Sequence, residues 1–417
     1  PAVPNPNCHP MSLSRLALLT AALFCCAPAA APAADELVAK VIPHAMARAV
    51  SQYEILYAGN DDPARVPRST GKDGKVVTVR FEDWTSGFFP GCLWFLHEYT
   101  GEKSWKTRAR EVTNRLERIR HFRGNHDGGF MLGCSFGNAL RLDPTDGDRA
   151  VLRDAANALA SRYIPAIGMI RSWDHGPYTC PVIIDNMMNL ELLSWAAKNG
   201  GESRLREIAL SHADHTHANH FRPDGSAYHV VDYNPENGWV RAIHATQGAD
   251  VRTPWARGQG WTLYGFTMMH RETGKPEYLE RATRLAGFLL SHPNLPADHV
   301  PSWDYGAEPG PDTPRDASAA AIIASALIEL ASIVPEDAAA GYLDHARSIL
   351  RTLASPAFLA EPGTHAGFLL TRSTGHLPGN SEISVPLIYA DYYFLEAMLR
   401  YRDHASGRKR VHFGQAR

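Results

Sequence analysis

Asp185 occupies a position where a carboxyl group could transfer a proton. It ends the apolar run Ile183-Ile184 and precedes Asn186 at the expected start of a helix. Apolar neighbours keep water from a carboxyl and raise its pKa, which suits an acid that must hold its proton near neutral pH. An aspartate at the start of a helix also commonly caps it by accepting a backbone N–H. The residues alone leave both interpretations open.

Asp127 is a second candidate carboxylate, in the segment His126-Asp127-Gly128-Gly129-Phe130. Asp-Gly is typical of a tight turn, so this aspartate also has a purely conformational explanation. On the residues alone, a turn and an active-site carboxylate explain Asp127 equally well.

Aromatic side chains near expected helix ends are candidates for lining a sugar site. A flat apolar ring packs against the C–H groups of a sugar while polar groups orient its hydroxyls. Aromatic residues on helices more often belong to the core, and this alternative stands for each of them. The candidates are Trp84, Phe130, Trp173 and Trp261.

Further segments with polar residues complete a recognisable order along the chain: Tyr228-His229, Gln247-Gly248, Trp255-Ala256-Arg257-Gly258-Gln259-Gly260-Trp261, and Ser381-Glu382 ahead of Asp391-Tyr392-Tyr393. Together with the segments around the two aspartates, they resemble the unsaturated glucuronyl hydrolases, glycoside hydrolase family 88. The resemblance extends from about Asp83 to Arg400, and its specificity lies in the combination of motifs.

The resemblance implies a role for each polar candidate. Asp185 would be the general acid and base, and Asp127 would face it across the cleft as the second active-site carboxylate. A negative charge there would help to keep Asp185 protonated. His229 and Gln247 would contact sugar hydroxyls or the leaving sugar.

Two further residues are implied in binding. Arg257 is the candidate that would neutralise the uronate carboxylate, because a guanidinium fork fits a carboxylate bidentately. The segment from Gly375 to Ile383 resembles the family's closing loop, through which Ser381 would reach the cleft.

The implied substrate is an oligosaccharide with an unsaturated uronic acid at its non-reducing end. A polysaccharide lyase leaves a C4–C5 double bond in that sugar. Asp185 would donate a proton to C4, and water activated by the resulting carboxylate would add at C5. The hemiketal would then open and expel the remaining sugar, so the carboxylate-separation rule for ordinary glycosidases does not apply.

Three alternatives remain. An unsaturated rhamnogalacturonyl hydrolase would share the fold and chemistry but act on pectin fragments; the fuller match around Asp185 and Trp255–Trp261 favours the glucuronyl group. A sugar epimerase would need histidine acid/base residues, for which His229 alone is thin support. A non-catalytic carbohydrate-binding protein would have no need of both Asp127 and Asp185.

Apolar residues recur at three-and-four spacing through most of the chain, which predicts a mainly helical protein. A large apolar residue also precedes an alanine by one helical turn in five places, as in Trp105…Ala109. The helices that we expect are 44–58, 84–99, 103–120, 130–141, 148–162, 186–198, 202–220, 255–272, 276–292, 315–333, 337–355 and 384–403.

Repeated helix–turn–helix units form either an open solenoid or a closed ring of hairpins. Four long connections favour the ring, since loops of this length are usually functional. They are 59–83, 163–185, 221–254 and 293–314. We therefore expect an all-α fold, an (α/α)6 barrel of six hairpins with a cleft formed by long loops at one end.

The overall charge argues against nucleic acid as a partner. Lys and Arg number 42 against 44 Asp and Glu, and no dense basic cluster is available to follow a phosphate backbone. Cys92, Cys134 and Cys180 are far apart, so neither a disulfide framework nor a zinc site is indicated. Phosphate-loop, nucleophile-elbow and His-Glu-x-x-His motifs are missing, and we expect no cofactor or metal.

Residues 11–34 have the order of a secretory signal peptide: a short polar start, an apolar run and small residues ending in Ala31-Pro32-Ala33. The apolar run is shorter than the ~20 residues that span a membrane. We expect residues 1–34 to be a leader, residues 35–417 to be a single catalytic domain, and the mature protein to be periplasmic or secreted.

Overall fold

The structure, a computed structural model, describes residues 35–409 and 412–413, and this part of the chain contains twelve α-helices. The leader expected at residues 1–34 lies outside the described residues. The α-helices are α1 (Ile42–Ala58), α2 (Phe88–Thr100), α3 (Lys103–Arg115), α4 (Asn138–Leu142), α5 (Asp146–Ala160), α6 (Leu190–Lys198), α7 (Arg204–Asn219), α8 (Ala256–Thr273), α9 (Pro276–Leu290), α10 (Ala317–Ala331), α11 (Glu336–Leu353) and α12 (Ile388–Ala405).

Shorter helical segments extend several of these helices. A π-helix, η1 (Leu37–Val41), leads into α1, and a second, η3 (Gly129–Gly137), leads into α4. The 3₁₀ segments are η2 (Leu116–Ile119) after α3, η4 (Ile184–Asn189) before α6, and η5 (His365–Gly367). With these extensions, each helix expected from the sequence corresponds to a helical segment of the structure.

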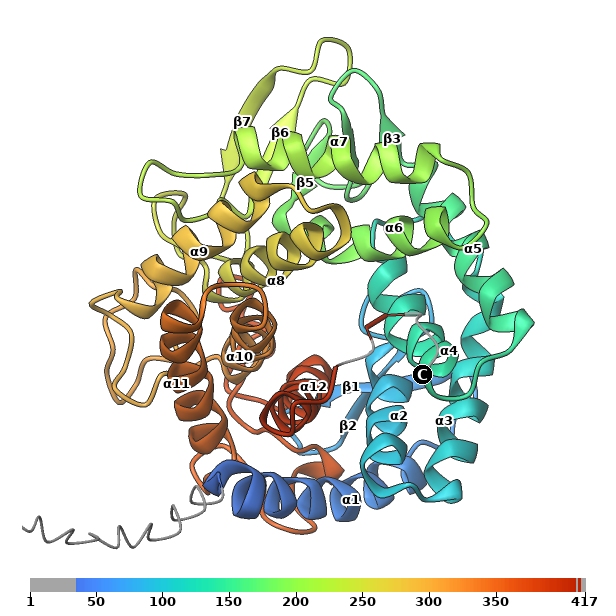
Figure 1. The fold of residues 1–417 in the computed structure, drawn as a ribbon, viewed down its shortest axis with the longest axis vertical. Helices are drawn as coiled ribbons and strands as arrows, with labels where there is room; N and C mark the ends of the chain where they lie inside the picture. The colour runs from blue at the N-terminus through green and yellow to red at the C-terminus, as the bar shows by residue number, and fades with distance from the viewer. Residues whose placement is uncertain (1–34, 410–411, 414–417) are drawn as a thin grey trace, which may run out of the picture. The chain divides into compact units, whose positions relative to one another are not determined.

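The helices form two concentric rings of antiparallel hairpins (Figure 1). Inner helices are buried on all sides: every residue of α10 is buried, and its many alanines allow close packing. Outer helices bury only one stripe, as in α11, where Ala339, Leu343, Ala346 and Leu350 recur at helical spacing. The sixth hairpin pairs inner α12 with outer α1, and the fold is the (α/α)6 barrel expected from the sequence.

Two near-identical turns end inner helices and begin outer ones. Gly101 ends α2 and Gly274 ends α8, both in the left-handed conformation with φ of 74°. Their N–H groups donate to the carbonyls of His97 and His270. A glycine adopts this conformation without the steric cost that a side chain would bring, which explains the repeated Thr-Gly in the two segments.

Seven short strands lie in three of the long connections, where the sequence indicated only loops. They are β1 (Arg65–Thr70), β2 (Val76–Arg80), β3 (Tyr163–Ile164), β4 (Met169–Ile170), β5 (Pro181–Ile183), β6 (Val230–Tyr233) and β7 (Val240–His244). All pairings are antiparallel, in the sheets β1-β2, β3-β4 and β5-β6-β7. Because β5 pairs with a strand almost fifty residues away, local patterning could not reveal it.

Within the described residues, no helix is both long and apolar enough to cross a bilayer. Cys92, Cys134 and Cys180 are all free thiols.

Candidate active site

Asp185 lies where β5 passes into the helical segment η4, in the first turn of that segment. No side chain caps this helix start, so Asp185 does not play the capping role that its position allowed. The residue is 7% exposed, and its Oδ2 has no hydrogen-bond partner. Leaving a buried carboxyl oxygen without a hydrogen-bond partner costs free energy of folding. Such an oxygen therefore points to a functional role.

Asp127 lies at the start of the helical segment η3 and is 8% exposed. Its carbonyl accepts the N–H of Met131 at 2.9 Å, so the Asp-Gly pair begins a helical turn rather than a hairpin. The Asn125 side chain accepts the N–H of Asp127, and His126 Nε2 lies 3.3 Å from its Oδ1. These contacts fix the backbone of Asp127 and leave its carboxyl at the N-terminal end of η3.

Asn189 holds together the two segments that carry the aspartates. Its Oδ1, on η4, accepts the N–H of Phe130 on η3 at 3.0 Å. A Cβ atom on Gly129 would come within 2.7 Å of the Asn189 Cα, so the close approach of the segments requires glycine there.

Burial raises the pKa of both carboxyls. For Asp185 burial dominates, the positive charge of Arg257 offsets it in part, and the pKa rises to about 7. For Asp127, burial and the negative charge of Asp185 both raise the pKa. Since two nearby buried carboxyls resist ionising together, the pair retains a proton near neutral pH.

His229 brings a neutral imidazole to Asp185. Its Nδ1 lies 2.8 Å from the carbonyl of Ala245 and 3.2 Å from the backbone N–H of Gln247, so these two groups hold the ring in place. The other nitrogen, Nε2, lies 4.0 Å from Asp185 Oδ2 and has no hydrogen-bond partner. Burial lowers the pKa of His229 to about 3, and the ring is neutral at physiological pH.

Arg257 is 2% exposed, and both of its Nη atoms are used within the protein. Nη1 donates to Asp316 and the carbonyl of Thr374, and Nη2 donates to Gln247 and the carbonyl of Gly375. The geometry therefore does not favour the bidentate uronate contact expected from the sequence. Arg257 instead joins Gln247 to the loop that follows Thr374, and its charge acts on Asp185 through space.

Three of the four candidate aromatics meet in one cluster. Phe130 lies between Trp84 and Trp261, with ring centroids 5.5 and 5.1 Å apart. Trp261 is 0% and Phe130 is 2% exposed, so neither offers an open face to a sugar, whereas Trp84 is half-buried. Trp173 does not join this cluster; its ring contacts His175 and Tyr178.

Ser381 is exposed and pairs with His376 through two backbone hydrogen bonds of 3.0 Å. The ring of His376 lies 3.2 Å from the carbonyl of Thr246, next to Gln247. No contact joins Ser381 to either aspartate among the described residues, and its reach into the cleft stays a prediction.

Sequence reasoning missed several residues that support the site. His126 adjoins Asp127, and Ser172 links them to the second aspartate by accepting the His126 N–H and donating to Asn186. Asp316 and Asn189 were also missed. Only His126, directly beside a candidate, gave a local signal.

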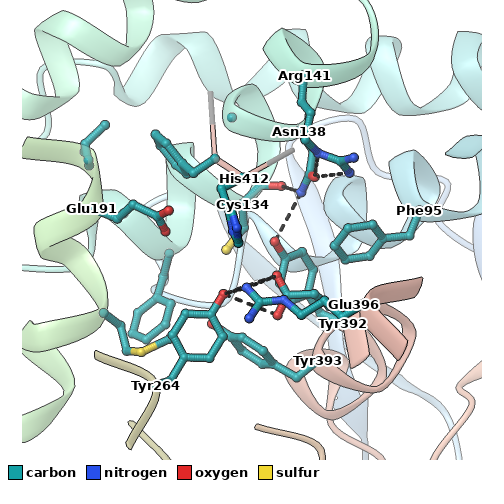
Figure 2. Close-up of a pocket in the computed structure, with 18 residues that line it drawn as sticks. Phe95, Cys134, Asn138, Arg141, Glu191, Tyr264, Tyr392, Tyr393, Glu396 and His412 are labelled. Atoms are coloured by element: carbon teal, nitrogen blue, oxygen red, sulfur yellow. Dashed lines mark hydrogen bonds and ion pairs between the residues drawn. The ribbon is translucent and has the colours of Figure 1, made fainter. Parts of the chain in front are cut away.

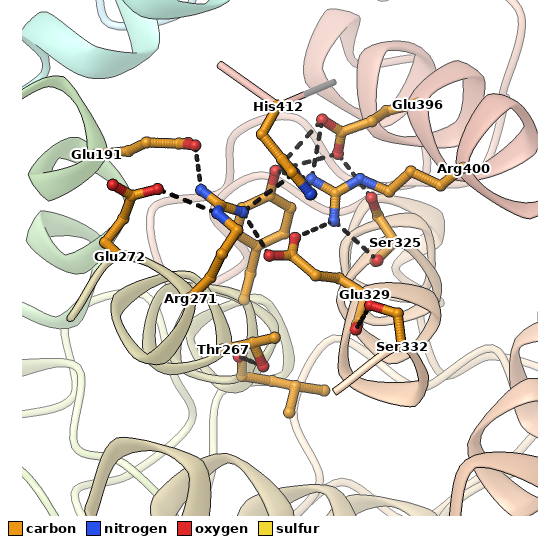
Figure 3. Close-up of polar contacts among 12 residues, drawn as sticks. Glu191, Thr267, Arg271, Glu272, Ser325, Glu329, Ser332, Glu396, Arg400 and His412 are labelled. Atoms are coloured by element: carbon orange, nitrogen blue, oxygen red, sulfur yellow. Dashed lines mark hydrogen bonds and ion pairs between the residues drawn. The ribbon is translucent and has the colours of Figure 1, made fainter. Parts of the chain in front are cut away.

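A second polar region lies inside the barrel around a cavity of about 60 Å³ (Figure 2). Here Arg271 contacts Glu191 and Glu329, and Arg400 contacts Glu329 and Glu396 (Figure 3). Burial would raise the pKa of Glu329, but the two arginines outweigh it and hold that pKa well below its usual range. Burial raises the pKa of Glu191 to about 7 despite Arg271.

Among the residues that the structure describes, no group of three or more His, Cys, Asp or Glu side chains is arranged to hold a metal ion.

Comparisons with known proteins give a consistent result. No family model matches the chain. An unsaturated glucuronyl hydrolase of Formosa agariphila is 45% identical over 338 residues, which cover 80% of this chain and 84% of the relative.

Solved structures match as well. A structure of an unsaturated glucuronyl hydrolase specific for heparin has a TM-score of 0.84 at 41% identity, covering 89% of this chain and 98% of the other. The enzyme of Bacillus sp. GL1 has a TM-score of 0.82 at 29% identity, with 88% and 98% covered. The chain thus belongs to the unsaturated glucuronyl hydrolase family and is a glycoside hydrolase.

Proposed function

We propose that this enzyme removes the 4,5-unsaturated glucuronyl residue from the non-reducing end of lyase-generated oligosaccharides by hydrating its C4–C5 double bond. The observation that carries the proposal is the Asp185 carboxyl. It is buried, its Oδ2 has no partner, and its pKa is raised to about 7. A carboxylic acid in this state holds a proton at neutral pH and can donate it.

In the proposed reaction, Asp185 donates its proton to C4 of the enol ether, and positive charge develops at C5. The Asp185 carboxylate then takes a proton from water as its oxygen bonds to C5. The resulting hemiketal opens, and the remaining sugar leaves as an alcohol. Repulsion from Asp185 raises the pKa of Asp127, so the pair holds a proton, and Arg257 stabilises the carboxylate that forms on Asp185.

His229 fits a role in orienting the substrate. Its Nδ1 contacts the Ala245 carbonyl and the Gln247 N–H, and its Nε2 has no partner and lies beside Asp185. A ring nitrogen beside Asp185 would bind a sugar hydroxyl or the attacking water, and Gln247, whose N–H contacts the same ring, would add a second polar contact.

Isotope labelling tests the chemistry. Reaction in heavy water should leave deuterium at C4, and oxygen-labelled water should enter at C5 rather than at the anomeric carbon. Label at the anomeric carbon would show direct glycosidic hydrolysis and overturn the proposal.

We propose a glycosaminoglycan fragment as the substrate. The 41% identical relative is described as specific for heparin, and the Bacillus enzyme as responsible for glycosaminoglycan degradation. A panel of unsaturated disaccharides from heparin, chondroitin and rhamnogalacturonan tests this. Turnover of the rhamnogalacturonan product alone would identify the pectin-degrading alternative.

We also propose that the protein is exported, because residues 11–34 have the order of a signal peptide. Sequencing of mature protein from the periplasm or the medium should find an N-terminus near Ala34 or Asp35. Cytoplasmic protein that still begins at Met11 would contradict export.

A further inference from the structure

The helical segment η3, which begins two residues after Asp127, is weak on its own account. Three of its nine residues, Gly129, Gly133 and Gly137, are glycine, which disfavours a helix because it loses the most backbone freedom on folding. A π-helix is also rare, and it occurs mostly at functional sites. The position of Asp127 at the start of η3 therefore depends on what packs against this segment.

The ring of Phe413, near the C-terminus, packs on two of these glycines. A Cβ atom on Gly133 would come within 2.5 Å of the Phe413 Cε2 atom, and one on Gly137 within 2.7 Å of the same atom. Neither glycine has a positive φ, so the backbone conformation does not require glycine there. The close approach of the Phe413 ring is what requires it.

Two further contacts anchor the tail, by which we mean His412 and Phe413. The Phe413 ring meets Trp195 of α6 edge to face, with ring centroids 6.2 Å apart. The Nδ1 atom of His412 lies 3.2 Å from Nη1 of Arg271 on α8. The tail thus contacts three elements of the barrel, of which η3 is the one that leads from Asp127.

The tail also forms part of the outer wall of the cavity of about 60 Å³ inside the barrel (Figure 2). The half-buried residues among those that line this cavity are Cys134, Glu191, His412 and Phe413. Phe130, three residues after Asp127, lines the same cavity from the buried side. Removing the Phe413 ring would therefore enlarge the cavity beside η3 on the side that faces solvent.

We propose that Phe413 is a positioning residue for the reaction: it holds η3 in place and so keeps the Asp127 carboxyl opposite Asp185. This inference rests on the proposed function, in which the two carboxyls hold the proton. Phe413 acts through η3 and does not touch the substrate, so it should affect the rate of the reaction and not the binding of the sugar. Small displacements of a group in an active site are enough to slow a reaction strongly.

Kinetics of the full chain with an unsaturated disaccharide, prepared from heparin with a lyase, test this role. Phe413→Ala should lower kcat by on the order of tenfold and change KM by less than about twofold. Phe413→Leu keeps an apolar side chain and should recover most of the rate. Phe288, a half-buried phenylalanine on α9, is the matched control, and Phe288→Ala should leave kcat unchanged.

The pH profile separates positioning from a general loss of stability. The charged and titratable groups around Asp127 are Asp83, Asp185, Arg162 and His126. Burial and the charge of Asp185 raise the pKa of Asp127, and both effects weaken if Asp127 moves away and meets water. The pair would then give up its proton at a lower pH. In Phe413→Ala, the fall of kcat on the basic side of the profile should therefore begin at a lower pH, whereas Phe288→Ala should keep the wild-type profile.

A paired substitution tests the contact itself. Gly137→Ala places a methyl group where the Phe413 ring lies, and should lower kcat about as much as Phe413→Ala does. In the Phe413→Ala background the added methyl group meets no ring, so the double variant should be no slower than Phe413→Ala alone.

A wild-type kcat and pH profile in Phe413→Ala, an equal loss in Phe288→Ala, or losses that multiply in the double variant would overturn the positioning role. A wild-type enzyme that turns over no unsaturated disaccharide would instead count against the proposed function.

Discussion

Two sets of buried carboxyls lie in this barrel, and they differ in their partners. In the inner region, Glu329 contacts Arg271 and Arg400, and its pKa is held well below the usual range. In the cleft, Asp127 and Asp185 have no hydrogen bond from an arginine among the described residues, and their pKa values are raised. Burial acts on both sets. The two arginines on Glu329 outweigh it, whereas the single arginine on Glu191 does not, so two direct arginine contacts are what turn a buried carboxyl of this barrel into a fixed charge.

The largest effect should come from removing the acid in the cleft. Asp185→Asn keeps the shape of the side chain but cannot donate its proton, so kcat should fall by about 10²–10⁴-fold or more. Circular dichroism should show an unchanged helical fold. A near-normal rate in this variant would mean that the proton comes from another group.

Removing the charge of Glu329 should have the opposite effect, lowering stability while leaving catalysis unchanged. Glu329→Gln leaves two buried arginines without their shared carboxylate and should lower the free energy of unfolding by about 3–5 kcal/mol. The folded enzyme should keep its kcat. Glu308→Gln, at an exposed position, is the matched control in denaturant unfolding. A stable Glu329→Gln protein with impaired kcat would erase the distinction between the two regions.

Arg257 tests whether one residue contributes both to catalysis, as Asp185 does, and to stability, as Glu329 does. Arg257→Lys keeps a positive charge near Asp185 but loses the planar fork that binds Gln247 and two carbonyls. We expect a loss of about 1–3 kcal/mol of stability together with a lower kcat. A raised KM with unchanged stability would instead indicate that Arg257 binds the uronate directly.

The pH dependence of stability should differ in sign between the regions. The folded-state pKa of Asp185 is raised to about 7, so its ionisation destabilises the fold progressively from about pH 4 to pH 7. The folded-state pKa of Glu329 is lowered, so its stabilisation is present above its unfolded pKa of about 4.3 and is lost as the pH falls below it.

Unfolding of wild type, Asp185→Asn and Glu329→Gln across this pH range measures the effect. Relative to wild type, Asp185→Asn should gain stability as the pH rises from about 4 to 7, while the deficit of Glu329→Gln should shrink in acid. Parallel pH profiles for the two variants would contradict the comparison.

Sequence patterning predicted the helices well because each buries a stripe or a whole surface that repeats locally, as in α11. It also indicated the desolvation of Asp185, since Ile183 and Ile184 adjoin it in the chain. It could not indicate the partners of Arg257, because the carbonyls of Thr374 and Gly375 lie more than a hundred residues away.

The pairing of β5 with β6 was missed for the same reason, since it forms only when two distant connections meet. By contrast, the contacts of Trp173 with His175 and Tyr178 are local, between rings of a single loop.

The pairing of α1 with α12 has a consequence for biogenesis. Tyr53 on α1 donates to Asp391 on α12, which also accepts the N–H groups of Leu369 and Leu370. The ring therefore cannot close while the ribosome is still making its last helix, and the earlier hairpins wait with one apolar edge uncovered. A chaperone that shields this edge should bind nascent chains that lack α12 and release those that contain it.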